Sequence, residues 1–150
     1  MKYKTKGIVF NFVKFRESSV IARIYTAQFG LKNYIINNVR SIKPRYPVSY
    51  FQPMTLLDMV VYNKNHADIN RIAEIKCWHP YKSIPYNVIK SSVALFITEI
   101  LYKTLREEEA NPELYNFMEG CLLFYDNVLE PSMNFHIQFL LKYDRFQGIE

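Results

Sequence analysis

The first half of the chain alternates apolar and polar positions with a period of two, the pattern of β-strands that are buried on one face. The polar segment 16–19 divides the first such run, which predicts a β-hairpin. Gly30 breaks the chain before the next run, and the turn-forming segment 63–65 separates the last two. We predict five strands, over residues 5–15, 20–26, 31–36, 54–62 and 68–78.

A long connection over residues 39–53 separates the third and fourth strands. It contains Pro44, Pro47 and Pro53. Proline lacks a backbone donor and fixes φ, so it is excluded from central strands and helix interiors. Five short strands of this kind are typical of a small OB-type barrel, whose second and third strands and adjoining loops bind oligonucleotides.

After Pro80 the period changes from two to 3.6, which predicts helices. Residues 88–105 are apolar on nearly all sides, so we expect this helix to be covered by other elements. Asn111 followed by Pro112 is a helix start, because Asn accepts from free amides and Pro needs no donor at the first position. This second helix is predicted to end near residue 129.

A third helix is predicted to begin at Ser132 and to end before Gly148. The fold class is therefore α+β: an amino-terminal five-stranded OB-type β-barrel over residues 1–80, followed by an α-helical domain over residues 81–150. We expect the helical domain to be incomplete, because apolar helix faces this wide normally pack against more chain.

Charge divides the chain at the same place. Residues 1–80 carry thirteen basic and four acidic side chains, net +9, and residues 81–150 carry six basic and ten acidic ones, net −4. The first 45 residues hold ten Lys or Arg and a single acid, Glu17, with aromatic rings between the cations. Cations neutralise phosphates and rings stack on bases, so the pattern favours a nucleic-acid partner. A solvated basic β-surface is the alternative.

The candidate interface follows from strand alternation. Arg23 and Tyr25 are expected beside Lys32 and Tyr34 on one exposed face, where the two rings would stack on bases. The connection after the third strand adds further cations that are expected to contact phosphates. The predicted DNA-binding residues are Lys14, Arg16, Arg23, Tyr25, Lys32, Tyr34, Arg40, Lys43 and Arg45.

The sequence contains little that indicates catalysis or metal binding. Cys77 and His79 supply at most half a zinc site, and two positions along a strand is poor spacing for a nucleophile and its base. A buried free cysteine is the simpler interpretation of Cys77. We predict no enzymatic activity, no cofactor and no metal. Two widely spaced cysteines, no signal-peptide pattern and no apolar run of about 18 residues predict a cytosolic chain without a membrane partner.

Several short segments together carry a family resemblance. They are Gly7 to Phe10, Lys14 to Ser19, Ile24 to Thr26, Phe29 to Leu31, Val39 to Ser41 and Phe51 to Met54. In this order and spacing they resemble the amino-terminal half of the bacterial RecO recombination mediator, and a looser resemblance continues to about Phe146. The chain departs from the family at Asn38, where many relatives have Gly. Asn tolerates positive φ, so we expect the turn to persist.

The resemblance implies an OB barrel followed by a helical domain, and a non-catalytic role in DNA repair and recombination. It implies binding of single- and double-stranded DNA, strand annealing, and RecA loading together with RecR and the single-stranded-DNA-binding protein. It also implies a cytoplasmic location, at the nucleoid during repair. Some relatives hold zinc with later cysteines, which this sequence lacks, so zinc is not expected.

The two halves are expected to bind different partners. In the helical half, apolar faces end in the cations Lys103, Arg106, Lys142 and Arg145, and we predict that they receive a short acidic and hydrophobic peptide, such as the tail of the single-stranded-DNA-binding protein. The alternative function of the whole is an OB-fold protein-interaction adaptor whose basic face binds an acidic protein tail.

Overall fold

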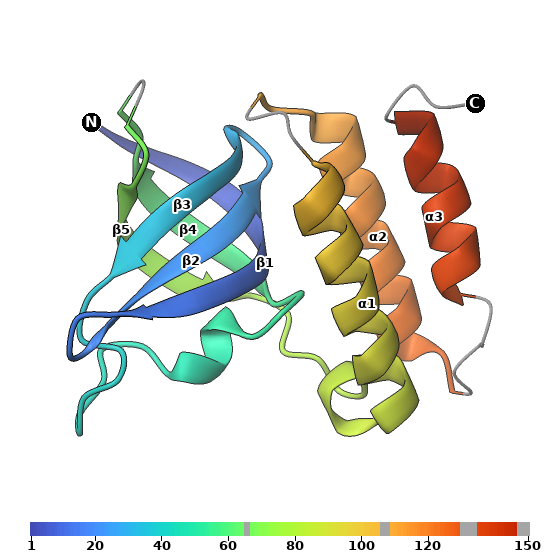
Figure 1. Cartoon of the computed structure of the whole chain (residues 1–150), viewed down its shortest axis with the longest axis horizontal. Coiled ribbons are helices and arrows are strands. Elements are labelled where there is room, and N and C mark those ends of the chain that lie inside the picture. The colour runs from blue at the N-terminus through green and yellow to red at the C-terminus, as the bar shows by residue number, and fades with distance from the viewer. Residues whose placement is uncertain (65–66, 106–108, 130–134, 147–150) are drawn as a thin grey trace.

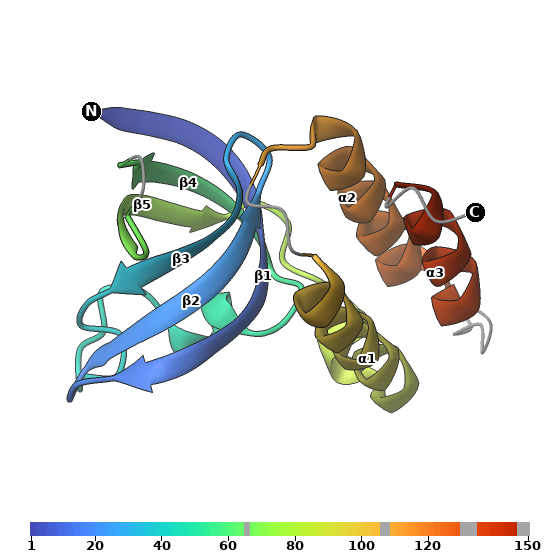
Figure 2. The same cartoon turned by 45° about the horizontal axis from the view of Figure 1, so that its top comes forward.

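A computed structural model describes residues 1–64, 67–105, 109–129 and 135–146, which form a closed barrel with helices standing along one side (Figures 1 and 2). The strands are β1 (Lys2–Phe15), β2 (Ser19–Thr26), β3 (Gly30–Ile36), β4 (Leu56–Tyr62) and β5 (Asn70–Cys77). The helices are α1 (Val88–Thr104), α2 (Pro112–Asn127) and α3 (Phe135–Phe146), and two 3-10 helices are η1 (Val48–Phe51) and η2 (Ile84–Tyr86). The predicted α+β fold, an OB-type barrel followed by helices, is confirmed.

Barrel closure depends on β1, which is long enough to pair with two neighbours in the order β1-β2-β3-β5-β4. Gly7 lies where the two pairings overlap, opposite both Thr26 of β2 and Leu57 of β4. A Cβ at this position would lie 2.6 Å from side-chain atoms of Ile24 and Met59. The glycine therefore allows the two sides of the barrel to approach each other.

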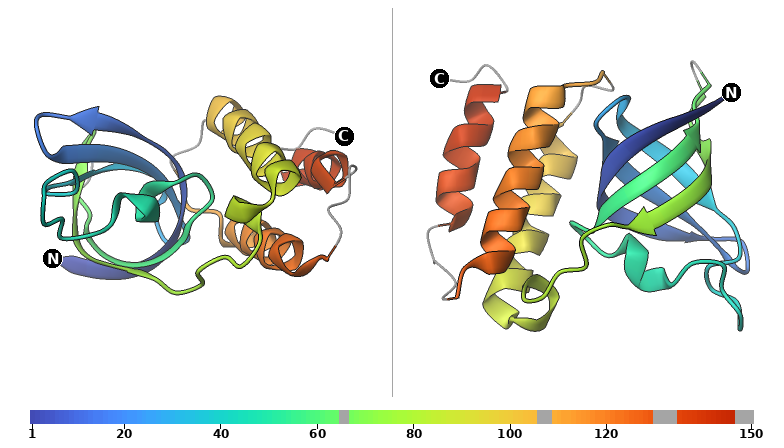
Figure 3. Two further views of the ribbon diagram at one scale, coloured as in Figure 1. Left: turned by 90° about the horizontal axis from the view of Figure 1, so that it is seen from below. Right: turned by 180° about the vertical axis from the view of Figure 1, so that it is seen from behind.

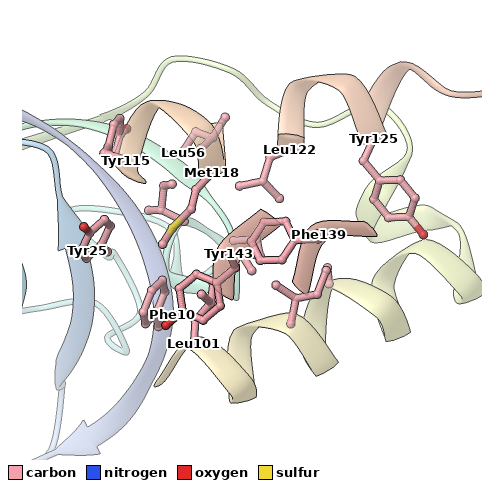
Figure 4. Close-up of a cluster of buried hydrophobic side chains, with 14 of the residues drawn as sticks. Phe10, Tyr25, Leu56, Leu101, Tyr115, Met118, Leu122, Tyr125, Phe139 and Tyr143 are labelled. Atoms are coloured by element: carbon pink, nitrogen blue, oxygen red, sulfur yellow. The ribbon is translucent and has the colours of Figure 1, made fainter. Parts of the chain in front are cut away.

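Two hydrophobic cores lie on the two sides of β1. Val9 points into the barrel interior, and Ile8 and Phe10 point outward to the helices. β1 is thus buried on both faces from Gly7 to Phe10, which explains its continuous apolar run there. The outer core is shown in Figure 4, where Phe10, Tyr25 and Leu56 from the barrel side meet Leu101, Tyr115, Met118, Leu122, Phe139 and Tyr143 from the helices.

The proline-rich connection forms no strand, as predicted, but contains η1. Seen from below, η1 lies across one open end of the barrel (Figure 3), and its Phe51 is buried in the interior core. β4 begins at Leu56, two residues later than predicted, because Met54 has a φ of 71°, which a strand does not accommodate.

The second helix, α2, begins where its capping signal places it. The Asn111 side chain accepts from the backbone amide of Leu114 at 3.1 Å, which confirms the predicted start of α2. The predicted boundary residues of the third helix, Ser132 and Gly148, lie outside the described residues. Throughout the described part of the chain, the helices lack the combined length and apolar character that a membrane span needs.

The expectation that α1 is covered on all sides is wrong. Ala94, Ile97 and Leu101 are buried, whereas Leu95 and Phe96 are 50% and 46% exposed. The buried residues belong to the core shared with the barrel and the other helices, and this core accounts for one face of α1. The division of the chain at residue 80 remains a prediction.

A buried carboxylate fastens the segment after β5 to the end of α2. Asp126 accepts from the backbone amides of Lys82, Ser83 and Ile84 at 3.0, 2.8 and 3.1 Å, and its Oδ2 lies 3.3 Å from His79 Nε2. Burial alone raises the pKa of Asp126, but these donors outweigh it and hold the pKa below its ordinary value.

A buried lysine belongs to the same junction. The Lys90 ammonium donates to the Ser83 hydroxyl at 2.8 Å and to the Val128 carbonyl, and it lies over the Tyr125 ring. Lys90 and Asp126 are therefore linked through Ser83. This network fixes the orientation of α1 and α2 relative to the segment that leaves the barrel.

Candidate nucleic-acid interface

The loop between β3 and η1 lies against the β1–β2 hairpin, at the end of the barrel away from the helices (Figures 1 and 3). The backbone amides of Val39 and Arg40 donate to the Ser18 carbonyl at 2.8 and 3.0 Å. Asn38 has a φ of 61°, which confirms that Asn supports this turn in place of Gly.

This hairpin and loop carry five of the predicted cations. Four of them are exposed, and we call them the tip cations: Lys14, Arg16, Lys43 and Arg45. Arg40 is different, because its guanidinium donates to the carbonyl oxygens of Ser19 at 3.2 Å and of Arg16. Arg40 therefore holds the loop on the hairpin, whereas the tip cations are exposed at this end of the barrel.

A cavity of about 370 Å³ opens where β3 and β5 separate. These two strands pair only through Tyr34 with Asn70 and Ile35 with Arg71. Arg45 lines the cavity, donates to the Ala73 carbonyl at 3.1 Å and lies 5.3 Å from the centroid of the Tyr46 ring. The other cations, rings and carboxylate in the lining are Lys2, Arg71, Tyr46, Tyr62 and Glu74.

Sequence reasoning missed Lys2, Tyr46, Tyr62 and Arg71. They are far apart along the chain and come from β1, the loop, β4 and β5. Only the closure of the barrel brings them together, and no local pattern marks them. The pairing of Lys2 with Tyr62 and of Tyr62 with Arg71 across the sheet is what joins three of them.

The prediction that Tyr25 and Tyr34 stack on bases is wrong, because the two residues are 1% and 0% exposed. Tyr25 lies between Phe10 and Tyr115, with ring centroids 6.0 and 6.4 Å away. Tyr34 lies in the barrel interior, where burial raises the pKa of its hydroxyl. Neither ring is accessible to a nucleic acid.

The predicted exposed face does not form, because β2 and β3 pair in a register that differs by one residue from the expected one. Arg23 lies opposite Asn33 and Tyr25 opposite Leu31, so Lys32 and Tyr34 point to the other side of the sheet. Lys32 lies opposite Ile24 and is partly buried.

The helices also occupy part of the outer face of β2. The Arg23 guanidinium donates to Asn11 Oδ1 at 2.9 Å and lies 5.1 Å from the centroid of the Tyr102 ring on α1. Lys6 of β1 also contacts the helices: its Nζ lies 3.8 Å from Glu119 Oε1 of α2 and 4.5 Å from the centroid of the Trp78 ring. These two cations join the barrel to the helices instead of extending the tip.

Within the described ranges, no three His, Cys, Asp or Glu side chains are close enough to hold a metal ion. Cys77 is partly buried, and burial raises the pKa of its thiol. His79 faces Asp126. The Cys77 thiol interacts with the backbone of His79, whereas the His79 ring is directed to Asp126.

A second, more open cavity of about 410 Å³ lies between the start of α2 and the end of α3. The stacked rings of Phe117 and Phe146, with centroids 5.1 Å apart, line it together with Lys142 and Arg145. Two of the cations predicted to receive a peptide therefore meet beside an apolar ring pair. Lys103 does not line this cavity, and Arg106 lies outside the described residues.

The closed five-stranded barrel in the order β1-β2-β3-β5-β4 has the architecture of the OB-fold proteins, many of which bind oligonucleotides. Comparison with protein families is more specific. Residues 1–81 match the family model described as "Recombination protein O N terminal", and residues 85–150 match "Recombination protein O C terminal". The chain belongs to the RecO family, which confirms the resemblance predicted from its sequence.

Individual relatives are named as DNA repair proteins. DNA repair protein RecO of Flavobacterium psychrophilum is 38% identical over 149 residues, which cover 99% of this chain and 62% of the relative. The RecO proteins of Phocaeicola vulgatus and Flavobacterium johnsoniae are each 34% identical with the same coverage. The chain thus spans 62% of the length of these relatives.

Proposed function

We propose that this chain is a non-catalytic, DNA-binding recombination mediator in DNA repair. It binds single- and double-stranded DNA through the barrel end, promotes annealing, and contributes to RecA loading with RecR and the single-stranded-DNA-binding protein. It acts in the cytoplasm, at the nucleoid during repair. Membership of the RecO family supports the general role.

The observation that carries DNA binding is the position of the tip cations. They lie on a hairpin and a loop that Arg40 holds together, at the barrel end opposite the helices. Lys14 and Lys43 are exposed, and neither forms an ion pair with an acidic residue in the described ranges. Cations held on a folded surface but open to solvent gain most from replacing counterions along a phosphate backbone.

Annealing requires no catalytic group in this mechanism. A cationic surface lowers the repulsion between two polyanions and raises their local concentration. We expect nuclease and ATPase assays, and zinc analysis of the purified protein, to be blank. The acceleration of annealing by the protein, relative to the rate without protein, is expected to fall as salt rises, because screening weakens the attraction between its cations and the strands.

Charge reversal tests the interface directly. The double variant Lys14→Glu with Lys43→Glu is expected to weaken binding of two unrelated single-stranded oligonucleotides equally, by about tenfold or more at low salt, because phosphate contacts carry no sequence information. The matched control is Lys82→Glu with Lys103→Glu, which changes net charge equally at exposed positions outside the tip. Equal losses in both variants, or a loss confined to one sequence, would contradict the proposal.

The alternative, an adaptor for an acidic protein tail, is tested in the same titration. An acidic peptide without bases competes with DNA only through charge. If it displaces DNA at equal charge concentration, and DNA affinity is weak at physiological salt, the adaptor function is favoured.

A peptide site in the helical half is a second proposal, and the cavity at Phe117 and Arg145 supports it. A peptide that ends in an aromatic residue and a carboxylate places its ring on Phe117 and Phe146 and its charge near Lys142 and Arg145. Calorimetry of the whole chain with such a peptide should give heat that Arg145→Glu abolishes and Lys82→Glu does not. An unchanged heat with Arg145→Glu would refute this site.

A further inference from the structure

The barrel is not evenly closed between β3 and β5. Their parallel ladder has only two pairs, and β5 continues to Cys77 with β4 alone as its partner. The cavity of about 370 Å³ occupies this gap, between Ile35 and Ile36 on one side and Ile72 and Ala73 on the other. Its volume lies within the usual range of small-ligand sites.

Two tyrosine rings line the gap, and each has a cation over it. Lys2 Nζ lies 5.8 Å from the centroid of Tyr62, and the Arg45 guanidinium lies 5.3 Å from the centroid of Tyr46. Both rings are partly exposed. An exposed cation–π contact is weaker than a stack of a base on an aromatic ring. A base can therefore displace either cation, which is then free to meet a phosphate.

Glu74 decides between ligand chemistries. It is exposed and lines the same cavity as Lys2, Arg45 and Arg71. A carboxylate in the lining repels a phosphate or a peptide carboxylate, but it accepts hydrogen bonds from the amino group of a base such as cytosine. The exposed cations of the same lining, Lys2, Arg45 and Arg71, favour the phosphates on either side of that base.

We infer that the gap between β3 and β5 is a pocket for one unstacked base of a single strand, held against Tyr62 or Tyr46. The inference rests on the proposed function and deepens it, because it predicts that single strands bind more tightly than duplexes. A base in a duplex must first be unpaired and unstacked to enter the pocket. Binding through the tip cations alone would give more similar affinities for single strands and duplexes.

The test combines a tyrosine substitution in the protein with removal of the bases from the DNA. Fluorescence anisotropy with the whole chain measures the affinity for a 12-nucleotide oligo-dC, for an abasic strand of the same length, and for a 12-base-pair duplex. Tyr62→Leu removes the ring but keeps apolar volume, and Tyr62→Phe keeps the ring. We expect Tyr62→Leu or Tyr46→Leu to weaken oligo-dC binding about fivefold or more. The same variants should leave the affinity for the abasic strand and the duplex within about twofold of the parent. Tyr62→Phe should bind all three ligands like the parent protein.

Other outcomes separate the two proposals. If both Leu variants bind oligo-dC like the parent, or lose oligo-dC and the abasic strand equally, the base pocket is refuted while loss of binding in the tip variant still supports DNA binding. If the tip variant binds all three ligands like the parent, the proposed function itself fails. If poly-glutamate and the abasic strand displace oligo-dC equally effectively, and Tyr62→Leu does not change oligo-dC affinity, the gap is an acidic-polymer site and the inference is wrong.

Discussion

Replacing Asp126 by Asn should destabilise the whole chain, although the two side chains have nearly the same shape. Asp126 Oδ2 accepts from the Lys82 amide and faces His79, while Oδ1 accepts from the amides of Ser83 and Ile84. An amide group can accept on only one side, so the variant leaves at least one buried N–H facing another donor. Hydrogen bonds to charged groups contribute about 1.5–3 kcal/mol each, so we expect a loss of about 3 kcal/mol.

Urea unfolding at pH 7, followed by circular dichroism, measures this loss. For a chain of this size it corresponds to a decrease in Tm of about 6–12 °C. Asp68→Asn is the control, because Asp68 is exposed and its replacement should change the free energy of unfolding by less than about 0.5 kcal/mol. A loss below about 1 kcal/mol for Asp126→Asn would show that the carboxylate is not what fastens this junction.

The same comparison has a pH dependence of known sign. The pKa of Asp126 is lowered in the folded protein, so its contribution is complete above the ordinary Asp pKa of about 3.9 and is lost as pH falls through the folded pKa. The stability difference between the parent and Asp126→Asn should be constant from about pH 5 to 8 and should shrink below about pH 4. A difference that already shrinks between pH 8 and 6 would contradict this.

Two further predictions concern the barrel. Gly7→Ala places a Cβ 2.6 Å from atoms of Ile24 and Met59. It should lower the free energy of unfolding in urea by about 1–3 kcal/mol. An unchanged unfolding midpoint would show that the barrel is packed more loosely than described. Arg23→Gln should leave single-strand affinity within about twofold in an anisotropy titration, because Arg23 faces Asn11 and Tyr102. A loss of tenfold would instead place DNA on the helix-covered face.

Local signals predicted most of the fold. The polar turn after Phe15 and the Asn111–Pro112 start act within a few residues, and both appear where expected. The alternation in β2 and β3 was also correct, but alternation does not give register. Thr26 pairs with Gly30, and a loop one residue longer would have placed Tyr25 opposite Lys32.

The candidate site was predictable only in part. The tip cations form two close pairs along the chain, Lys14 with Arg16 and Lys43 with Arg45, so their charge was visible in the sequence. The cavity at Tyr62 and Arg71 needs barrel closure, and the buried Lys90 and Asp126 look like ordinary surface charges until the helices are placed. Long-range packing decides which cations are free and which join the barrel to the helices.

The salt dependence of single-strand affinity tests the central claim most directly. Fluorescent oligonucleotide is titrated with the parent chain and with the Lys14→Glu, Lys43→Glu variant at several salt concentrations. If the barrel end neutralises about five phosphates, log affinity should fall with log salt at a slope near −3.5 for the parent, and near −2 for the variant, at about 0.7 per contact. A flat response, or the same steep slope in both proteins, would contradict DNA binding by the tip cations.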